Sequence, residues 1–212
     1  DSFRKLGVRA NADTPADAQR ARDFGAEGIG LFRTEHMFYG KGAEKPLFAL
    51  RKMILSGTLA ERQAAVDELF PFVKKDIKAT LEAMDGLPVT VRLLDPPLHE
   101  FIPHSHEQQL EISKALDISH DEFKKRADSL KESNPMMGHR GVRLGVTYPE
   151  VTEMQIRAIL ESAAELIKAK KQCKPEIMIP VTCDPNELKD QKVIVAKVAE
   201  EVKKKFKLKE LE

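Results

Sequence analysis

Three arginines stand where their chemistry would matter, because each lies where an apolar stretch gives way to a loop. Arg33 lies in the string Gly-Leu-Phe-Arg-Thr-Glu-His, Arg92 in Val-Arg-Leu-Leu-Asp, and Arg140 in Gly-His-Arg-Gly. A guanidinium is always charged, and its planar fork of N–H donors fits phosphate or carboxylate oxygens with two hydrogen bonds. Three such forks brought together would form a site for a small, highly charged anion.

The alternative for these arginines is a surface or ion-pair role, since arginine is common and mostly exposed in folded proteins. On spacing alone, Arg33 has a partner in Glu35, and Arg92 has one in Asp95. Glu35 fits two descriptions equally well, a carboxylate that orients Arg33 or one that starts a helix. The sequence leaves both open.

Histidines near the arginines invite a zinc interpretation that the spacing does not support. A zinc-binding helix of the metalloprotease type needs His-Glu-x-x-His on one face. After His99 the next histidine, His104, comes one position late, and Pro103 breaks the helix. We therefore expect these histidines in a loop. His139, beside Arg140, fits either a donor behind that arginine or a structural residue.

The pattern of apolar stretches predicts alternating strands and helices. Strands are expected over residues 6–12, 28–32, 88–94 and 176–181. Helices are expected over residues 16–24, 46–54, 60–84, 108–116, 121–131, 149–171 and from 184 to about 206. This order predicts an α/β fold with a parallel sheet, in which active residues gather at the carboxyl ends of the strands. All three arginines can therefore face the same end of the sheet.

Local signals refine this outline at two places. Asp13, Thr14 and Pro15 are typical of a helix start, and Gly25 is typical of the residue just beyond a helix end. Residues 95–148 form a polar excursion after the third strand. Within the excursion, Met136 and Met137 are expected to fill the core.

Composition excludes some classes of function. The formal net charge is +1, with 42% hydrophobic and 33% charged residues. A nucleic-acid-binding protein would carry a basic footprint, and a membrane span needs about 18 apolar residues in a row, which this sequence lacks. We therefore expect no nucleic acid and no membrane as partners. Cys173 and Cys183 follow no disulfide-scaffold pattern, which favours a reduced, cytoplasmic location. A targeting segment would lie upstream, so an organelle stays open.

The arginine strings, taken at full length, resemble the pyruvate phosphate dikinase family among the phosphoenolpyruvate (PEP)-utilising enzymes. The similar stretches are residues 28–38, 89–101, 134–144 and 175–180, with shorter ones at 11–15 and 148–150. The related PEP synthases and enzyme I of the phosphotransferase system share the Arg-Thr-Glu and Asn-Pro-x-x-Gly-x-Arg patterns. Leu-Asp-Pro-Pro-Leu-His-Glu points to the dikinases. Phe32 stands where many members carry a small residue or cysteine, and we interpret it as a packing variation.

The resemblance implies a (β/α)₈ barrel of the TIM type, of which this chain would hold about the first four units. Residues 1–212 would then be a single partial domain, the N-terminal half of the PEP/pyruvate-binding barrel. The whole enzyme would interconvert ATP, phosphate and pyruvate with AMP, diphosphate and PEP. The phosphohistidine and nucleotide-binding domains of the same full-length chain would be partners. A homodimer is also expected.

The resemblance also assigns roles to residues. Catalytic and substrate-binding roles fall on Arg33, Arg92 and Arg140, with Glu35, His36, Asp95 and His139 as candidates for supporting them. The family uses Mg²⁺, held by a glutamate and an aspartate on later strands, and an acid cysteine in a Cys-Gly-Glu string. This sequence contains neither the family's Gly-Thr-Asn-Asp nor its Cys-Gly-Glu string. We therefore expect no metal ligand in this chain, and no dikinase activity from the chain alone.

A second hypothesis treats the chain as an anion-binding or self-associating module without catalysis. Half a barrel would leave sheet edges near residues 6–12 and 175–181 unpaired, and exposed edges recruit partners. The missing half would also leave apolar side chains uncovered on the inner faces of the second and third strands. Both features favour a dimer, a rearranged sheet or marginal stability.

Overall fold

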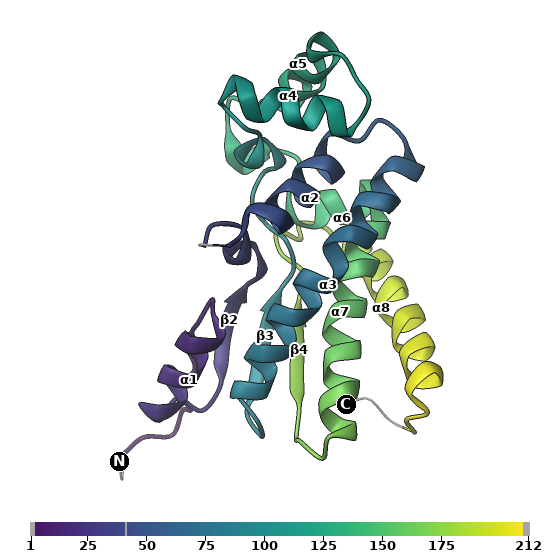
Figure 1. The fold of residues 1–212 in the computed structure, drawn as a ribbon. Helices are drawn as coiled ribbons and strands as arrows, with labels where there is room; N and C mark the ends of the chain where they lie inside the picture. Colours follow the sequence, from purple (N-terminus) through teal and green to yellow (C-terminus); the bar gives the residue numbers. More distant parts are fainter. Residues whose placement is uncertain (1–2, 41, 210–212) are drawn as a thin grey trace.

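The computed structural model of the chain describes residues 3–40 and 42–209 and has an α/β architecture. Its centre is a four-stranded sheet in which each strand pairs in parallel with the next, in the order β1-β2-β3-β4. The strands are β1 (Ala10–Asn11), β2 (Ile29–Arg33), β3 (Pro88–Arg92) and β4 (Lys174–Met178). They run upward in Figure 1, so their carboxyl ends lie at one end of the molecule. The predicted parallel α/β fold is confirmed.

Helices cover the sheet and extend beyond its upper end. They are α1 (Pro15–Asp23), α2 (Glu44–Leu55), α3 (Leu59–Ala83), α4 (His106–Ala115), α5 (His120–Ser129), α6 (Gly141–Thr147), α7 (Pro149–Lys168) and α8 (Pro185–Phe206). Three short 3-10 turns are η1 (Thr34–Phe38), η2 (Leu98–Phe101) and η3 (Pro135–Met137). Helices α3, α7 and α8 lie side by side, whereas α4 and α5 stand at the top of Figure 1. The arrangement is consistent with part of a TIM-barrel-like domain, and the described residues do not close a barrel.

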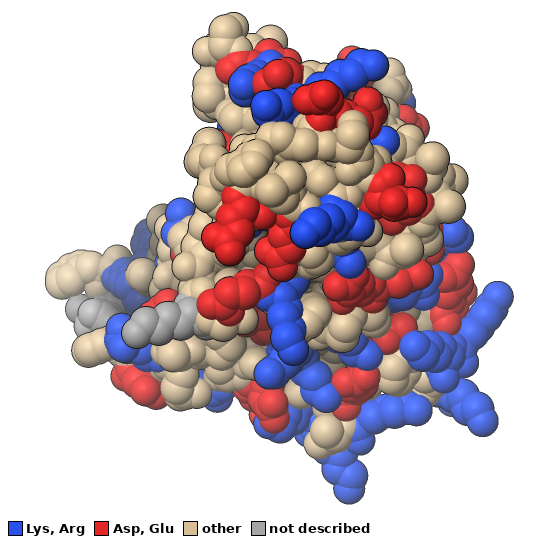
Figure 2. Space-filling view, turned by 45° about the horizontal axis from the view of Figure 1, so that its top comes forward, with Lys and Arg blue, Asp and Glu red and all other residues tan. Residues whose placement is uncertain are grey.

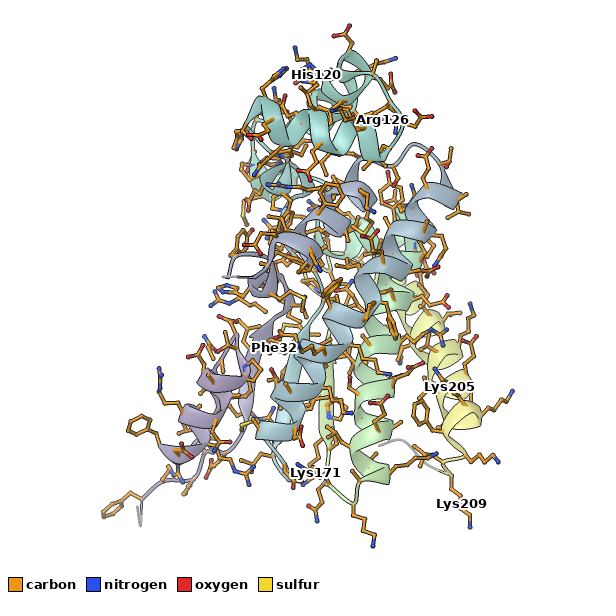
Figure 3. The ribbon with its side chains drawn as sticks, viewed as in Figure 1. Phe32, His120, Arg126, Lys171, Lys205 and Lys209 are labelled. Carbon is orange, nitrogen blue, oxygen red and sulfur yellow. The ribbon has the colours of Figure 1, made fainter. Side chains whose placement is uncertain are left out.

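The core lies between the sheet and the helices. Ile29 and Phe32 of β2 stand in register with Val89 and Val91 of β3, and all four are fully buried. Residues paired in register share a face of the sheet, so these four point into the helix layer together. Phe32 lies near the middle of the molecule in Figure 3. It is a core residue, in agreement with the packing interpretation.

The opposite face of the sheet is polar. The guanidinium of Arg9 donates to both carboxylate oxygens of Glu176, at 2.6 and 3.1 Å, and the Thr90 hydroxyl donates to Glu176 at 2.6 Å. A Cβ atom on Gly30 would lie 3.2 Å from Cβ of Arg9, so the missing side chain there lets Arg9 lie close to β2. The expectation of uncovered apolar side chains is therefore wrong for β3, whose valines lie in the core.

Several predicted strand boundaries are wrong, and for two of the strands the structure gives a local reason. The first strand holds only residues 10–11 rather than 6–12, because at a sheet edge it has one neighbour and its register shifts. The fourth ends at Met178, short of the predicted residue 181; Pro180 has no N–H for a ladder, and Val181 adopts a positive φ of 60°. Helix α6 was not predicted.

The excursion at residues 95–148 holds α4 and α5 against α2 through two arginines. Nε of Arg51 in α2 donates to the Phe101 carbonyl at 2.8 Å, and NH1 of Arg126 in α5 donates to the Leu55 carbonyl at 2.8 Å. Figure 3 labels Arg126 in the upper part of the molecule, together with His120 at the start of α5. One bond therefore joins α2 to the turn η2 within the excursion, and the other joins α5 to the last residue of α2.

Ion pairs link the outer helices. The Glu161 carboxylate in α7 accepts from Lys74 of α3 at 2.8 Å and from Lys205 of α8 at 2.7 Å, and Lys74 also lies 2.6 Å from Glu165. We call Lys74, Glu161, Glu165 and Lys205 the helix-layer network. Acidic and basic side chains are interspersed on the face that Figure 2 presents. None of the helices in the described part of the chain has the length and apolarity that crossing a membrane requires.

Candidate anion-binding site

Strand register brings two of the predicted arginines together. Arg33 is the last residue of β2, Arg92 is the last residue of β3, and the two are partners in the parallel register. Neighbouring strands lie about 4.8 Å apart, so both side chains start from adjacent points at the carboxyl end of the sheet. Arg140 comes from the excursion and occupies the residue just before α6. The three arginines therefore reach one end of the sheet from three different elements.

A continuous chain of ion pairs runs through Arg92. Its NH2 nitrogen pairs with Glu35 of η1, and its NH1 nitrogen lies 3.1 Å from Oδ2 of Asp95. The same Oδ2 atom lies 3.0 Å from NH2 of Arg140, while Nε of Arg140 donates to the Asp95 carbonyl at 3.0 Å. Asp95 thus joins β3 to the loop that carries Arg140.

Arg33 is held by a different carboxylate, that of Asp13 in the turn between β1 and α1. Nε of Arg33 lies 3.0 and 3.1 Å from the two Asp13 oxygens, and NH2 pairs with the same group. The main-chain N–H of Arg33 also donates to Asp13 at 3.1 Å. The His36 ring nitrogen Nδ1 lies 3.6 Å from Asp13. Sequence reasoning took Asp13 only as part of a helix start, although its place after the first strand was a usable signal.

The two partner assignments made from spacing have different outcomes. The Arg92–Asp95 pair is present. Glu35, expected beside Arg33, instead pairs with Arg92 on the neighbouring strand. Since η1 turns directly after Arg33, the Glu35 side chain is carried over toward β3.

The three guanidinium groups differ in which donors the protein already uses. In Arg33, the edge formed by Nε and NH2 faces Asp13, and NH1 has no partner among the described residues. In Arg140, Nε and NH2 face Asp95, and NH1 meets only the Met136 sulfur at 3.8 Å. In Arg92, both terminal nitrogens face carboxylates. Arg33 and Arg140 therefore keep donors for a further anion, whereas Arg92 is enclosed.

Two buried atoms in this cluster lack hydrogen-bond partners. They are Oε2 of Glu35 and Nε of Arg92. Only 5% of the Glu35 side chain is exposed, so bulk water does not compensate its free oxygen. Unpaired buried polar atoms are uncommon in folded proteins and costly where they occur. Their presence distinguishes this cluster from an ordinary structural ion pair.

Three carboxylates balance the three arginines in formal charge: Asp13, Glu35 and Asp95. Burial on its own raises the pKa of Asp13, but hydrogen bonds from the Arg33 side chain and main chain outweigh it, and the pKa lies below its usual value. The Asp13 hydrogen bond in turn raises the pKa of Arg33. Both groups are therefore charged at neutral pH, and their pair persists down to acidic conditions.

His139 and the two methionines beside it lie at the edge of the site. The His139 ring bonds to the Thr147 hydroxyl, and burial lowers its pKa. This contact links it to α6 rather than to a guanidinium, which fits the structural alternative. The prediction that Met136 and Met137 fill the core is wrong. They are 67% and 66% exposed, because η3 projects from the surface before Arg140.

The described residues contain no group of three or more histidine, cysteine, aspartate or glutamate side chains placed to hold a metal ion. Carboxylate ligands are what Mg²⁺ prefers, and the acidic residues at the site are already paired with arginines. We assign no metal ligand to the described part of the chain.

Comparison with known proteins gives consistent matches. Residues 1–211 match the family model for the PEP-binding domain of PEP-utilising enzymes. The chain is 52% identical over 205 residues to the pyruvate, phosphate dikinase of Clostridium symbiosum, covering 96% of this chain and 23% of that protein. It is 48% identical over 202 residues to the dikinase of Giardia intestinalis, covering 95% and 22%. For the chloroplastic dikinase 1 of Arabidopsis thaliana, identity is 49% over 204 residues, covering 95% and 21%. The chain thus spans less than a quarter of these relatives.

Proposed function

The chain belongs to the PEP-utilising enzymes through their PEP-binding domain, and on that premise we propose that its arginine site binds PEP and pyruvate. One observation carries the proposal: Arg33 and Arg92 end adjacent parallel strands, and Asp95 ties Arg140 to them. PEP carries a phosphate and a carboxylate on a three-carbon frame. Both groups suit guanidinium forks, so two or three converging arginines can hold one such molecule in a single orientation.

We further propose that the site serves a pyruvate phosphate dikinase, as the names of the similar proteins suggest. In that reaction a phosphoryl group moves between a histidine nitrogen on a carrier domain and the enolate oxygen of pyruvate. The P–N bond breaks as the P–O bond forms, and charge spreads over the phosphoryl oxygens. Such transfers depend on positioning and charge stabilisation, which fixed guanidinium groups provide.

The three arginines would divide this work. Arg33 and Arg140 keep N–H donors for the oxygens of the ligand. Arg92 is enclosed by Glu35 and Asp95, so its main contribution is positive charge and a fixed position for both carboxylates. The carboxylates hold the guanidinium planes in place before the ligand arrives. Less side-chain entropy is then lost on binding, which favours affinity.

The charge balance supports a role for Mg²⁺ in the complete enzyme. Three carboxylates offset the three arginines, so the described cluster cannot neutralise a multiply charged anion alone. A divalent cation would supply the missing charge. We propose that its ligands come from parts of a longer protein, as would the phosphohistidine and nucleotide-binding domains. We also propose that the chain on its own lacks dikinase activity.

The alternative is an anion-binding module that self-associates without catalysis. The observation that favours it is the free edge of β4, which has no second neighbour in the described sheet. Exposed edges pair readily with other copies. Light scattering tests this directly: a monodisperse monomer would count against self-association and against the proposed homodimer of this chain. Pyruvate-dependent consumption of ATP by the pure chain would contradict the proposed inactivity.

The test of the binding proposal is calorimetric titration of PEP into the chain, with and without Mg²⁺. We expect measurable binding that weakens about tenfold or more in Arg33→Ala and Arg140→Ala, because a hydrogen bond to a charged group is worth roughly 1.5–3 kcal/mol. Arg20→Ala is the matched control, since Arg20 is an exposed arginine on α1 outside the cluster. Equal affinities in all four proteins would refute the assignment.

A further inference from the structure

We propose that Asp13 is a positioning residue of this site, whose carboxylate fixes Arg33 so that its outer guanidinium edge faces the anion. The inference rests on the proposed function for the identity of the anion, but its geometry does not. A guanidinium has two edges that can each grip an oxygen pair, Nε with NH2 and NH1 with NH2. Asp13 occupies the first edge, and NH1 of Arg33 has no partner among the described residues.

Asp13 also binds the main chain of Arg33. One oxygen, Oδ1, accepts from both the main-chain N–H and Nε of Arg33, at 3.1 and 3.0 Å. The same carboxylate therefore sets the backbone at the end of β2 and the direction of the side chain that leaves it. An arginine side chain otherwise has many rotamers, and each one lost on binding lowers affinity.

The turn that carries Asp13 is itself well anchored. Ala12 is buried, and its N–H donates to the Leu31 carbonyl in β2 at 3.1 Å. On the other side, the Thr14 hydroxyl accepts from the Asp17 N–H and starts α1. Asp13 is held between a strand and a helix and is 13% exposed in its side chain. A carboxylate with so little freedom suits the task of orienting another group.

Asp13 also reaches His36, whose Nδ1 lies 3.6 Å away. One carboxylate thus touches two side chains of the Arg-Thr-Glu-His string, one on each side of the turn from β2 into η1. Replacement by asparagine keeps the size but removes the charge and one acceptor oxygen. Replacement by glutamate keeps the charge but moves it by one methylene. These two variants separate charge from position.

The experiment follows the Nε–Hε signal of Arg33 in ¹⁵N-labelled chain by NMR, assigned by its loss in Arg33→Lys, alongside PEP titrations. In Asp13→Asn we expect the Arg33 Hε signal to move upfield, its exchange with water to accelerate, and PEP affinity to fall about tenfold. Asp13→Glu should recover part of both changes. Asp17 is an acidic residue of the same helix start, so Asp17→Asn serves as the control. It should change neither the Arg33 Hε signal nor the PEP affinity.

Three other outcomes overturn the proposal. An unchanged Arg33 signal in Asp13→Asn would show that Asp13 does not hold the guanidinium. A changed signal with unchanged PEP affinity would show that its hold does not serve binding. Main-chain shifts throughout the sheet would reduce Asp13 to a structural residue. If the unmodified chain binds no PEP, the proposed function fails for this chain, and the Arg33 signal alone still decides whether Asp13 positions it.

Discussion

The helix-layer network and the arginine cluster at the strand ends differ in how completely their buried polar atoms are hydrogen-bonded. In the helix-layer network both oxygens of Glu161 accept hydrogen bonds, and its lysines reach it from neighbouring helices. In the cluster at the strand ends, Glu35 and Arg92 each keep a buried atom without a partner. A network that only holds helices together gains from complete satisfaction. The strand-end cluster is therefore less completely satisfied than the helix-layer network, which fits our proposal that it takes a further ligand.

The cations differ in kind as well. The helix-layer network uses lysines, which are flexible point charges, whereas the strand-end cluster uses arginines with planar, directional donors. Lysine suffices where any favourable geometry holds two helices. Arginine is needed where direction matters. The comparison therefore predicts that changes in the two clusters affect different measurements.

The largest effect is expected from Arg92→Ala, because it leaves the buried Glu35 carboxylate without its partner and removes one of two from Asp95. Breaking a buried ion pair costs about 3–5 kcal/mol in the free energy of unfolding. Urea denaturation measures this loss, and PEP binding should vanish with it. Arg92→Lys should recover part of the stability and little of the binding. A loss below about 1 kcal/mol would erase the contrast with the helix layer.

A middle-sized effect is expected from Glu161→Gln. Its carboxylate is almost fully buried and serves Lys74 and Lys205, but Lys74 keeps a second partner in Glu165. The free energy of unfolding should fall by about 1.5–3 kcal/mol, the usual worth of a hydrogen bond to a charged group. PEP affinity should not change. A loss of affinity here would show that the two clusters are coupled.

Lowering the pH should reduce the stability that both clusters contribute. The loss from each carboxylate should be smaller than the losses predicted above. For Asp13 and Glu161, burial raises the pKa, but hydrogen bonds from their cationic partners outweigh it and lower the pKa. A lowered pKa in the folded state stabilises the protein above the unfolded pKa of about 4, and this stabilisation is lost as pH falls through the folded value. Denaturation between pH 3 and 7 should show a shallower decline for Asp13→Asn and for Glu161→Gln. Identical slopes in all three proteins would contradict this.

The smallest effect is expected from Lys171→Ala, which removes an exposed pair with Glu82 at the lower end of the molecule (Figure 3). Exposed ion pairs contribute about 0–1 kcal/mol, and we expect less than about 0.5 kcal/mol here. Denaturation should show this small difference in low salt and a still smaller one in high salt, because salt screens exposed charges. A large loss of unfolding free energy in Lys171→Ala would mean that the exposure of an ion pair does not predict its contribution to stability in this protein.

Local signals made parts of the fold predictable. Thr14 and Pro15 start α1, and Gly25 follows its end with a φ of 87°, as expected. Helix α6 escaped prediction because it is short and contains Gly141 and Gly145, which are poor helix formers. The first strand was overestimated because apolar alternation does not reveal that a strand lies at an edge with one neighbour.

The arginines of the candidate site were predictable from residue type and position, but their partners were not. Arg33 pairs with Asp13, twenty positions earlier in the sequence, across one β-α-β unit. Glu35 pairs across to the next strand rather than with its neighbour in sequence. Such pairs depend on strand register and on the direction of a turn. Neither can be read from spacing along the chain.

The register between β2 and β3 places Arg33 opposite Arg92, so the site forms only when these two strands pair in the native register. A slip of one residue would send one arginine to the opposite face of the sheet. Only chains with the native pairing could then bind the anion. A ligand that binds only the native form stabilises it by mass action, more strongly as its concentration rises. If the site binds PEP as we propose, the ligand would therefore selectively stabilise correctly folded copies.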